Sequence, residues 1–198
     1  MHLLFPKPAL FLARHGQTQW NQSGLLQGQL DSQLTAAGRQ QSRQLALQLA
    51  TAEIDQVVCS DLNRAKQTAA ICAGLLDCPI QIDAGLNEQN FGDWQGLSID
   101  WLIKNTGYQA AACAPNGESN IEVANRMQHT VSTILKRYSG QNILLIGHGT
   151  ALKHYFTEYL TGFDLAKAVP ENGQVYKFSY CRRVHNLIRI KKMSGQAA

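Results

Sequence analysis

The sequence of 198 residues predicts an α/β fold, a three-layer α/β/α sandwich with a mostly parallel sheet and an antiparallel C-terminal edge. Two observations predict it. Short apolar runs alternate with longer stretches of helical periodicity through the first 160 residues, as in consecutive βα units. Two strand-like segments, 174–181 and 184–191, then follow with only Arg182-Arg183 between them, as in a hairpin. We expect one domain over 1–198, since this length suits a single core.

The first half of the chain contains three short apolar or alternating runs, and two helical stretches follow the first two of these runs. The expected elements are strands at 9–14, 56–60 and 80–82, a helix from the N-cap Thr35 to about Ala50, and a helix capped by Ser60-Asp61. The segment 15–34 is long for a connection and rich in Gly, Gln, Asn and Ser, which is typical of a functional loop.

The second half begins with an irregular stretch, 85–120, that contains a short helix around 99–105 and a turn at Pro115-Asn116-Gly117. We expect residues of about 97–120 to form a cap inserted into the domain. The remaining expected elements are a helix at 118–138, a strand at 143–147, a helix at about 150–160 and the two C-terminal strands.

Composition argues against several classes of protein. The formal net charge is +4, and Arg182, Arg183, Arg189, Lys191 and Lys192 carry the positive charge of the C-terminal stretch. A basic strand of this kind is typical of a solvated face, so we expect no nucleic-acid partner. No apolar run is long enough for a membrane span, and the N-terminus lacks a signal-peptide pattern. Five cysteines without a CxxC pair indicate a cytoplasmic protein. A homodimer is compatible with the sequence.

Two strands end in the same way. Residues 9–14 run into His15-Gly16, and residues 143–147 run into His148-Gly149. In parallel α/β sheets ligands bind at the carboxyl edge, so we expect the two imidazoles to meet there. A following glycine lets the backbone approach a ligand, and the helix that begins near Thr150 can direct amides at an anion.

Two arginines accompany the histidines. Arg14 precedes His15, and Arg64 lies in the first turn of the helix after the second strand. A cation at a helix N-terminus opposes the helix dipole, and a bound anion would explain its presence. One guanidinium group can donate two parallel N–H bonds to the oxygens of a phosphate. The two arginines and two histidines together therefore indicate a site for a phosphate dianion.

A carboxylic acid completes the expected chemistry. Glu88 lies in the aromatic and glycine-rich loop 86–96, where it is a candidate proton donor to a leaving alcohol. Asp93 in the same loop is a competitor, and spacing does not choose between them. Neither HxH, HExxH nor GxxxxGK[ST] occurs, so we expect no metal and no P-loop.

An ordered set of motifs resembles the histidine phosphatase superfamily, the phosphoglycerate mutase-like proteins. RHGxTxxN matches residues 14–21, and the other matching blocks are Gln27-Gly28 with Asp31, Leu34-Thr35 and Gly38; Ser60-Asp61-Leu62 with Arg64-Ala65 and Gln67-Thr68; Leu86 with Glu88, Phe91-Gly92 and Gly96; Pro115 with Gly117-Glu118-Ser119; and Gly147-His148-Gly149. The RHG triplet alone would be weak evidence for this family, but the ordered set of motifs spans most of the chain and is strong evidence.

The resemblance implies a role for each matching residue. His15 would be the nucleophile that is transiently phosphorylated, and Glu88 would be the acid and base. Arg14, Arg64 and His148 would hold the phosphoryl oxygens. The remaining implied phosphate- or substrate-binding residues are Asn21, Gln27, Gly28, Gly149 and Thr150.

The resemblance also implies an enzyme, with three alternatives. The first is a phosphoric monoester hydrolase that needs no cofactor and acts on a small phosphorylated metabolite. The second is a bisphosphoglycerate-dependent mutase, whose glutamate is followed by Arg-His-Tyr. Here Glu88 is followed by Gln89-Asn90-Phe91, which resembles the α-ribazole and broad-specificity phosphatases instead. The third is an inactive interaction module, which the presence of all five catalytic residues disfavours.

Overall fold

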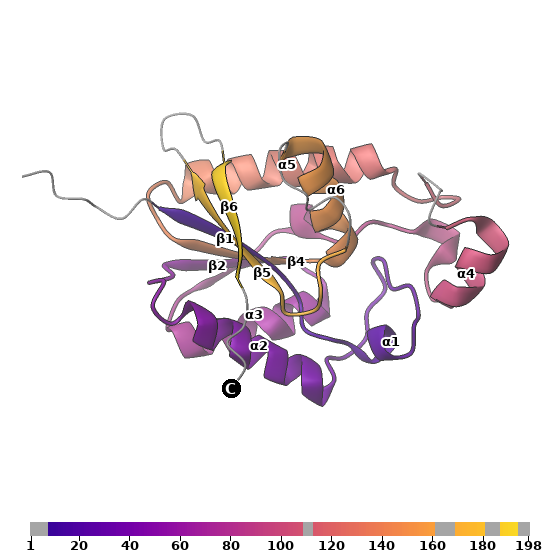
Figure 1. The fold of residues 1–198 in the computed structure, drawn as a ribbon, viewed down its shortest axis with the longest axis horizontal. Helices are drawn as coiled ribbons and strands as arrows, with labels where there is room; N and C mark the ends of the chain where they lie inside the picture. The colour runs from indigo at the N-terminus through magenta and orange to yellow at the C-terminus, as the bar shows by residue number, and fades with distance from the viewer. Residues whose placement is uncertain (1–7, 109–112, 161–168, 181–186, 194–198) are drawn as a thin grey trace, which may run out of the picture.

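The computed structural model describes residues 8–108, 113–160, 169–180 and 187–193, and these residues form a single mixed sheet covered by helices on both faces (Figure 1). The strands are β1 (Ala9–Arg14), β2 (Gln56–Cys59), β3 (Ile80–Ile82), β4 (Ile143–Gly147), β5 (Val175–Tyr180) and β6 (Leu187–Met193). The α-helices are α1 (Gln19–Gln22), α2 (Ala36–Leu49), α3 (Asn63–Leu76), α4 (Ile99–Thr106), α5 (Asn120–Arg137) and α6 (Gly149–Tyr159), with 3-10 turns η1 (Ala84–Leu86) and η2 (Gly92–Trp94).

The strand order β3-β2-β4-β1-β5-β6 confirms the predicted α/β class. β1 and β2 both pair in parallel with β4, and β3 pairs in parallel with β2. β5 runs antiparallel to β1, and β6 runs antiparallel to β5, as the predicted C-terminal edge requires. The expected turn at Arg182-Arg183 lies outside the described residues.

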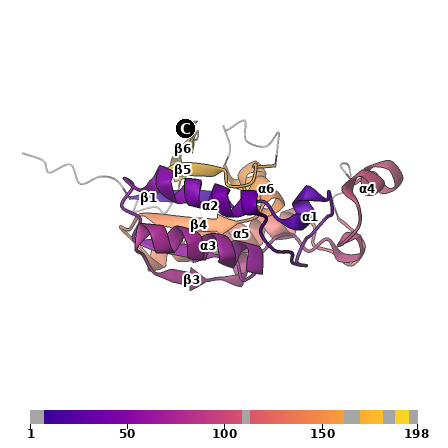
Figure 2. The same ribbon diagram turned by 90° about the horizontal axis from the view of Figure 1, so that it is seen from below.

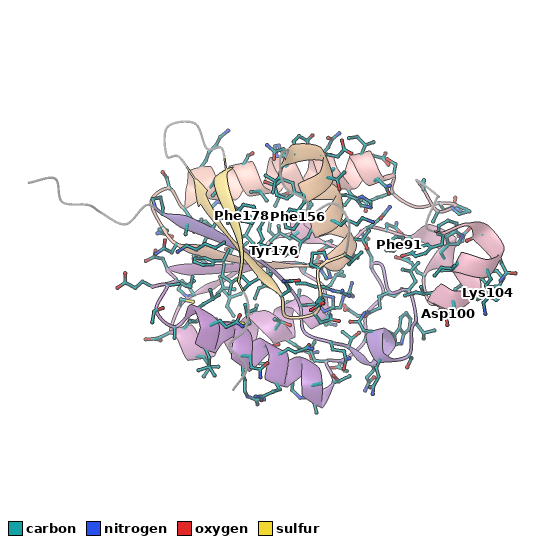
Figure 3. The ribbon with its side chains drawn as sticks, in the orientation of Figure 1. Phe91, Asp100, Lys104, Phe156, Tyr176 and Phe178 are labelled. Atoms are coloured by element: carbon teal, nitrogen blue, oxygen red, sulfur yellow. The ribbon has the colours of Figure 1, made fainter. Side chains whose placement is uncertain are left out.

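Each face of the sheet has its own core. One core joins side chains of β1 and β4 to α5 and α6, and it includes Phe156, Tyr176 and Phe178, which lie together in Figure 3. The aromatic rings of Phe156 and Tyr176 meet edge to face with centroids 5.2 Å apart. The other core packs the opposite face against α2 and α3, which Figure 2 shows in front of the sheet. None of the helices in the described ranges is long and apolar enough to cross a membrane.

The predicted helix cap at Ser60-Asp61 is wrong. α3 begins at Asn63 after the N-cap Leu62, whose side chain makes no capping bond. The Asp31 carboxylate supplies the acceptor instead, receiving the backbone N–H of Asn63 at 2.8 Å and that of Arg64 at 3.4 Å. An acid from a distant loop therefore satisfies the start of α3, because a carboxylate is the best partner for a helix N-terminus.

A third apolar cluster lies beyond the carboxyl ends of the parallel strands. It joins Leu26 and Phe91 to Leu102 of α4 and to Ala114, with Trp94 and Tyr108 packed against it. Figure 1 shows α4 and α1 at this end of the molecule, away from the helices that cover the sheet. The segment 97–120, which is expected to form a cap, contributes Leu102, Tyr108 and Ala114 to this cluster. Its residues 109–112 lie outside the described ranges.

The loop after β1 packs backbone to backbone on α2. A Cβ atom on Gly38 would lie 2.0 Å from the Gln17 carbonyl oxygen, and one on Gly16 would lie 2.3 Å from the Gly38 carbonyl oxygen. Such contacts tie the segment that carries His15 to the start of α2, because only glycine permits the approach.

We therefore expect Gly38→Ala to lower the free energy of unfolding by about 1–3 kcal/mol, as overpacking does. Gly74→Ala in α3 is the matched control, since a Cβ there meets no atom within 4 Å. Replacing an exposed helical glycine by alanine should raise the free energy of unfolding by up to about 1 kcal/mol. Urea denaturation measures both changes. Equal effects of the two substitutions would contradict the close packing.

Candidate active site

The register of β1 and β4 brings the two histidines together. Arg14 stands opposite Gly147 in this parallel pair, and the His15 backbone N–H donates to the Gly147 carbonyl oxygen at 3.0 Å. Each strand ends one residue before its histidine, so both rings leave the sheet at the same level. Their centroids lie 5.1 Å apart. The predicted meeting of His15 and His148 at the carboxyl edge is what the structure shows.

The His15 ring is buried and held by its neighbour's backbone. Its Nδ1 atom lies 2.7 Å from the Gly16 carbonyl oxygen. A carbonyl oxygen only accepts, so Nδ1 carries the hydrogen and Nε2 keeps a free lone pair. Burial lowers the pKa of His15 well below its usual value, and the positive charges of Arg64 and Arg14 lower it further. The ring is therefore neutral at pH 7, and the lone pair on Nε2 is of the kind that can act as a nucleophile.

The His148 ring has the opposite arrangement. Its Nε2 atom lies 2.8 Å from the Ser60 hydroxyl oxygen, while that hydroxyl donates its own hydrogen to Asn87 Oδ1 at 2.8 Å. The Ser60 oxygen is thus left to accept from Nε2–H, and Nδ1 remains without a partner. Burial lowers the pKa of His148, and the charge of Arg64 contributes next.

The two predicted arginines are held by hydrogen bonds from their terminal nitrogens, and the Nε atom of each has no partner. Arg64 is fully buried, and its terminal nitrogens donate to Asp31 Oδ1 at 2.9 Å and to the carbonyl oxygens of Leu30 and Gly28 at 2.7 and 2.6 Å. Arg14 donates through Nη1 to the Pro170 carbonyl oxygen at 2.7 Å. The anion that the sequence predicts beside Arg64 is thus, in part, the protein's own Asp31.

Three buried side-chain nitrogens in the described part of the chain have no hydrogen-bond partner. They are Arg14 Nε, Arg64 Nε and His148 Nδ1. An unsatisfied buried polar group costs about 1–3 kcal/mol, so native proteins rarely keep one without a use. Here the charges of Arg14 and Arg64 both act on His15 and on His148. The two arginine Nε–H groups therefore lack an acceptor, while the neutral His148 ring leaves the Nδ1 lone pair without a donor.

Glu88 reaches this cluster and Asp93 does not. The Glu88 side chain is buried, its Oε1 accepts the Ala151 N–H at 2.8 Å, and its Oε2 accepts the Thr150 N–H at 3.1 Å. Its charge acts on both Arg14 and Arg64. Asp93 is exposed on η2, where it accepts from the Asn116 side chain. Of the two candidate carboxylates, only Glu88 therefore lies beside the two arginines, and its position favours it over Asp93.

The other predicted binding residues surround the cluster at different depths. Thr150 directs its amide at Glu88, so this N–H is engaged rather than free for a phosphate. Gly149 lies against Arg14, since a Cβ there would stand 3.1 Å from the guanidinium carbon. Gly28 holds Arg64 through its carbonyl, and the neighbouring Gln27 is buried with its side-chain oxygen on Ser32.

Asn21 connects to the site through a residue that the sequence reasoning missed. The Asn172 side-chain N–H₂ donates to the His15 carbonyl oxygen at 3.1 Å and to Asn21 Oδ1 at 3.2 Å. The Gly173 N–H also donates to the carbonyl oxygens of Arg14 and His15. No motif or periodicity marks these residues, because they act from a loop more than 150 positions away in sequence.

Comparison with known proteins gives a consistent result. The family model described as the histidine phosphatase superfamily (branch 1) matches residues 10–192. This chain belongs to the histidine phosphatase superfamily. The resemblance that the motifs predict is thereby confirmed.

Individual relatives of this histidine phosphatase carry both phosphatase and mutase names. A curated protein of Enterobacter sp. (strain 638) named "Probable phosphoglycerate mutase GpmB" is 38% identical over 151 residues, covering 72% of this chain and 70% of its own. A mycobacterial glucosyl-3-phosphoglycerate phosphatase complexed with VO3 has a TM-score of 0.81 at 26% identity, covering 96% of this chain and all of its own. The α-ribazole phosphatase of Shigella flexneri has a TM-score of 0.77 at 27% identity, covering 91% of this chain and 94% of its own.

The two imidazoles should show opposite tautomers in ¹⁵N NMR of the ligand-free protein. His15 is expected to carry its hydrogen on Nδ1 and His148 on Nε2. Because the folded-state pKa of each ring lies well below 6.5, both should stay neutral as the pH falls through 6.5. A charged ring at pH 6.5, or the same tautomer on both, would contradict the geometry.

Proposed function

We propose that this chain is a phosphomonoesterase that needs no metal and acts through a phosphohistidine on His15. The observation that supports it most is the set of three partnerless buried nitrogens around a neutral imidazole. Two are guanidinium N–H donors, and the third is the imidazole Nδ1 of His148, which donates once it is protonated. A phosphoryl group offers three acceptor oxygens and two negative charges, which fits this set. The VO3 bound to the mycobacterial relative is an oxyanion of the same kind, which favours the same use here.

In the first step His15 Nε2 attacks phosphorus and the ester P–O bond breaks. The leaving oxygen takes a proton from Glu88, and the N–H groups of Arg14 and Arg64 neutralise the charge on the equatorial oxygens. The Nδ1–H bond to the Gly16 carbonyl stabilises the positive charge that develops on the ring.

In the second step a water molecule attacks the phosphohistidine and gives its proton to Glu88. The P–N bond breaks and His15 returns to its neutral form. The same carboxylate thus serves as acid and then as base. Its two oxygens accept the N–H groups of Thr150 and Ala151, and these bonds fix the position of the carboxyl group.

The substrate class is a small phosphorylated metabolite, and the third apolar cluster is proposed as the cap over it. Tyr108 packs on Trp94 edge to face with centroids 5.9 Å apart. Burial raises the pKa of Tyr108 to about 12, with the charge of Glu88 as the second cause, so the phenol lies within electrostatic reach of the acid. These aromatic side chains favour a phosphate ester whose alcohol has an apolar or ring-bearing portion. Free thiols at Cys59, Cys72, Cys78 and Cys113 fit a cytoplasmic protein.

A phosphoglycerate mutase is the second candidate, and the name of the Enterobacter relative favours it. A mutase must hold a second phosphoryl group beside the first, which calls for further cations. The two positions after Glu88 instead carry amides that the fold uses. Gln89 donates to the Glu118 carbonyl oxygen at 2.8 Å, and Asn90 accepts from the Gly92 N–H at 2.8 Å. This supports hydrolysis over mutase chemistry.

The test is a panel of phosphomonoesters assayed for phosphate release, with and without 2,3-bisphosphoglycerate. We expect release that does not depend on the bisphosphate and that survives a chelator of divalent metals. Interconversion of 2- and 3-phosphoglycerate that requires the bisphosphate, with no release, would establish the mutase instead. Loss of all activity with the chelator would overturn the metal-independent mechanism.

Substitution of the proposed acid should depend on the leaving group. Glu88→Gln is expected to slow hydrolysis of alkyl phosphates by about 10²–10⁴-fold and that of p-nitrophenyl phosphate far less, because nitrophenolate leaves without a proton. Asp93→Asn is the matched control and should change neither rate, since Asp93 is exposed. Steady-state kinetics decide the point, and equal losses on both esters would show that Glu88 is not the acid.

A further inference from the structure

We propose that Arg126 of α5 is the positioning residue for Glu88, acting together with Glu118. The inference rests on the proposed function and deepens it by naming what holds the acid in place. Neither residue touches the predicted nucleophile. Both bind the segment 85–90, which contains Glu88.

Arg126 binds the backbone that leads into the acid. Its Nη1 donates to the carbonyl oxygens of Gly85 and Asn87 at 2.9 and 3.0 Å, and its Nη2 lies 3.4 Å from the carbonyl oxygen of Glu88. One guanidinium thus contacts three carbonyls within four residues. A planar fork of N–H donors can do this, and no other side chain offers the same geometry.

Glu118 closes the arrangement from the other end of the segment. It receives Arg126 Nε at Oε1 and Arg126 Nη2 at Oε2, both at 3.0 Å. Its Oε2 also accepts the Asn90 N–H at 2.8 Å, and its own N–H donates to the Asn90 carbonyl oxygen at 2.8 Å. The Arg126–Glu118 pair therefore holds the chain on both sides of Glu88.

The same segment also orients His148. Asn87, whose carbonyl Arg126 binds, accepts the Ser60 hydroxyl hydrogen through its side chain, and this leaves the Ser60 oxygen to accept from His148. A shift of the segment would thus move the acid away from the amides of α6 and loosen the imidazole. Catalysis is sensitive to such shifts, since a displacement of about 1 Å can cost on the order of 10²-fold in rate.

The position of the pair makes a purely structural role a poor explanation. The side chains of Arg126 and Glu118 are 24% and 26% exposed. Partly exposed ion pairs contribute little to stability, so this pair is not needed to hold a core together. Its three guanidinium–carbonyl contacts and its two bonds to the Asn90 backbone all go to the segment 85–90, which contains the acid.

The experiment compares kcat/KM for an alkyl phosphate and for p-nitrophenyl phosphate in wild type, Arg126→Met, Arg126→Lys, Glu118→Gln and Glu88→Gln. We expect the alkyl-to-aryl ratio to fall by about tenfold or more in Arg126→Met and Glu118→Gln, in the direction of Glu88→Gln. Arg126→Lys should recover part of the ratio, because an ammonium still binds carbonyls but cannot form the fork. Arg137→Met, an exposed arginine of the same helix, is the matched control and should leave the ratio unchanged.

The ratio does not depend on the concentration of folded enzyme, so a partly unfolded variant still reports it. A ratio equal to that of wild type in Arg126→Met, whatever the total activity, would overturn the positioning role, and so would a complete loss on both esters. Absence of phosphate release by the wild-type protein would instead reject the proposed function. The two failures are therefore distinguishable.

Discussion

The site depends on the parallel pairing of β1 with β4. Because Arg14 stands opposite Gly147, the next residue of each strand is a histidine that leaves the sheet at its carboxyl edge. The hydrogen bond from the His15 N–H to the Gly147 carbonyl extends this register by one residue. A shift of one position would turn one imidazole to the opposite face of the sheet. Neighbouring strands alone therefore bring together residues 133 positions apart.

Burial gives the two imidazoles their chemical character. Both rings are enclosed among guanidinium groups, and this environment disfavours a further positive charge, so both remain neutral. Their different hydrogen-bond partners then separate the roles. The carbonyl bonded to His15 leaves a lone pair at Nε2, while the hydroxyl bonded to His148 leaves its Nδ1 without a partner. Two identical side chains are thus left with different ring nitrogens unbonded.

The sequence predicted the strands, the helices other than α1, and the meeting of His15 with His148, because each is marked locally. Apolar runs followed by His-Gly identify the carboxyl edge without any knowledge of the fold. The contacts that fix the geometry carry no such mark. Asn172 and Arg126 act through pairings that depend on the complete fold, and neither stands in a motif. The capping of α3 was mispredicted for the same reason, since the Asp31 carboxylate comes from a distant loop.

The central claim is that His15 is the residue that accepts the phosphoryl group. The most direct measurement is rapid mixing with a phosphomonoester followed by mass spectrometry under conditions that spare acid-labile phosphate. The account predicts one phosphate on His15 that decays with turnover, and none in His15→Asn. An active enzyme with no adduct on His15, or with the phosphate on His148 instead, would contradict it.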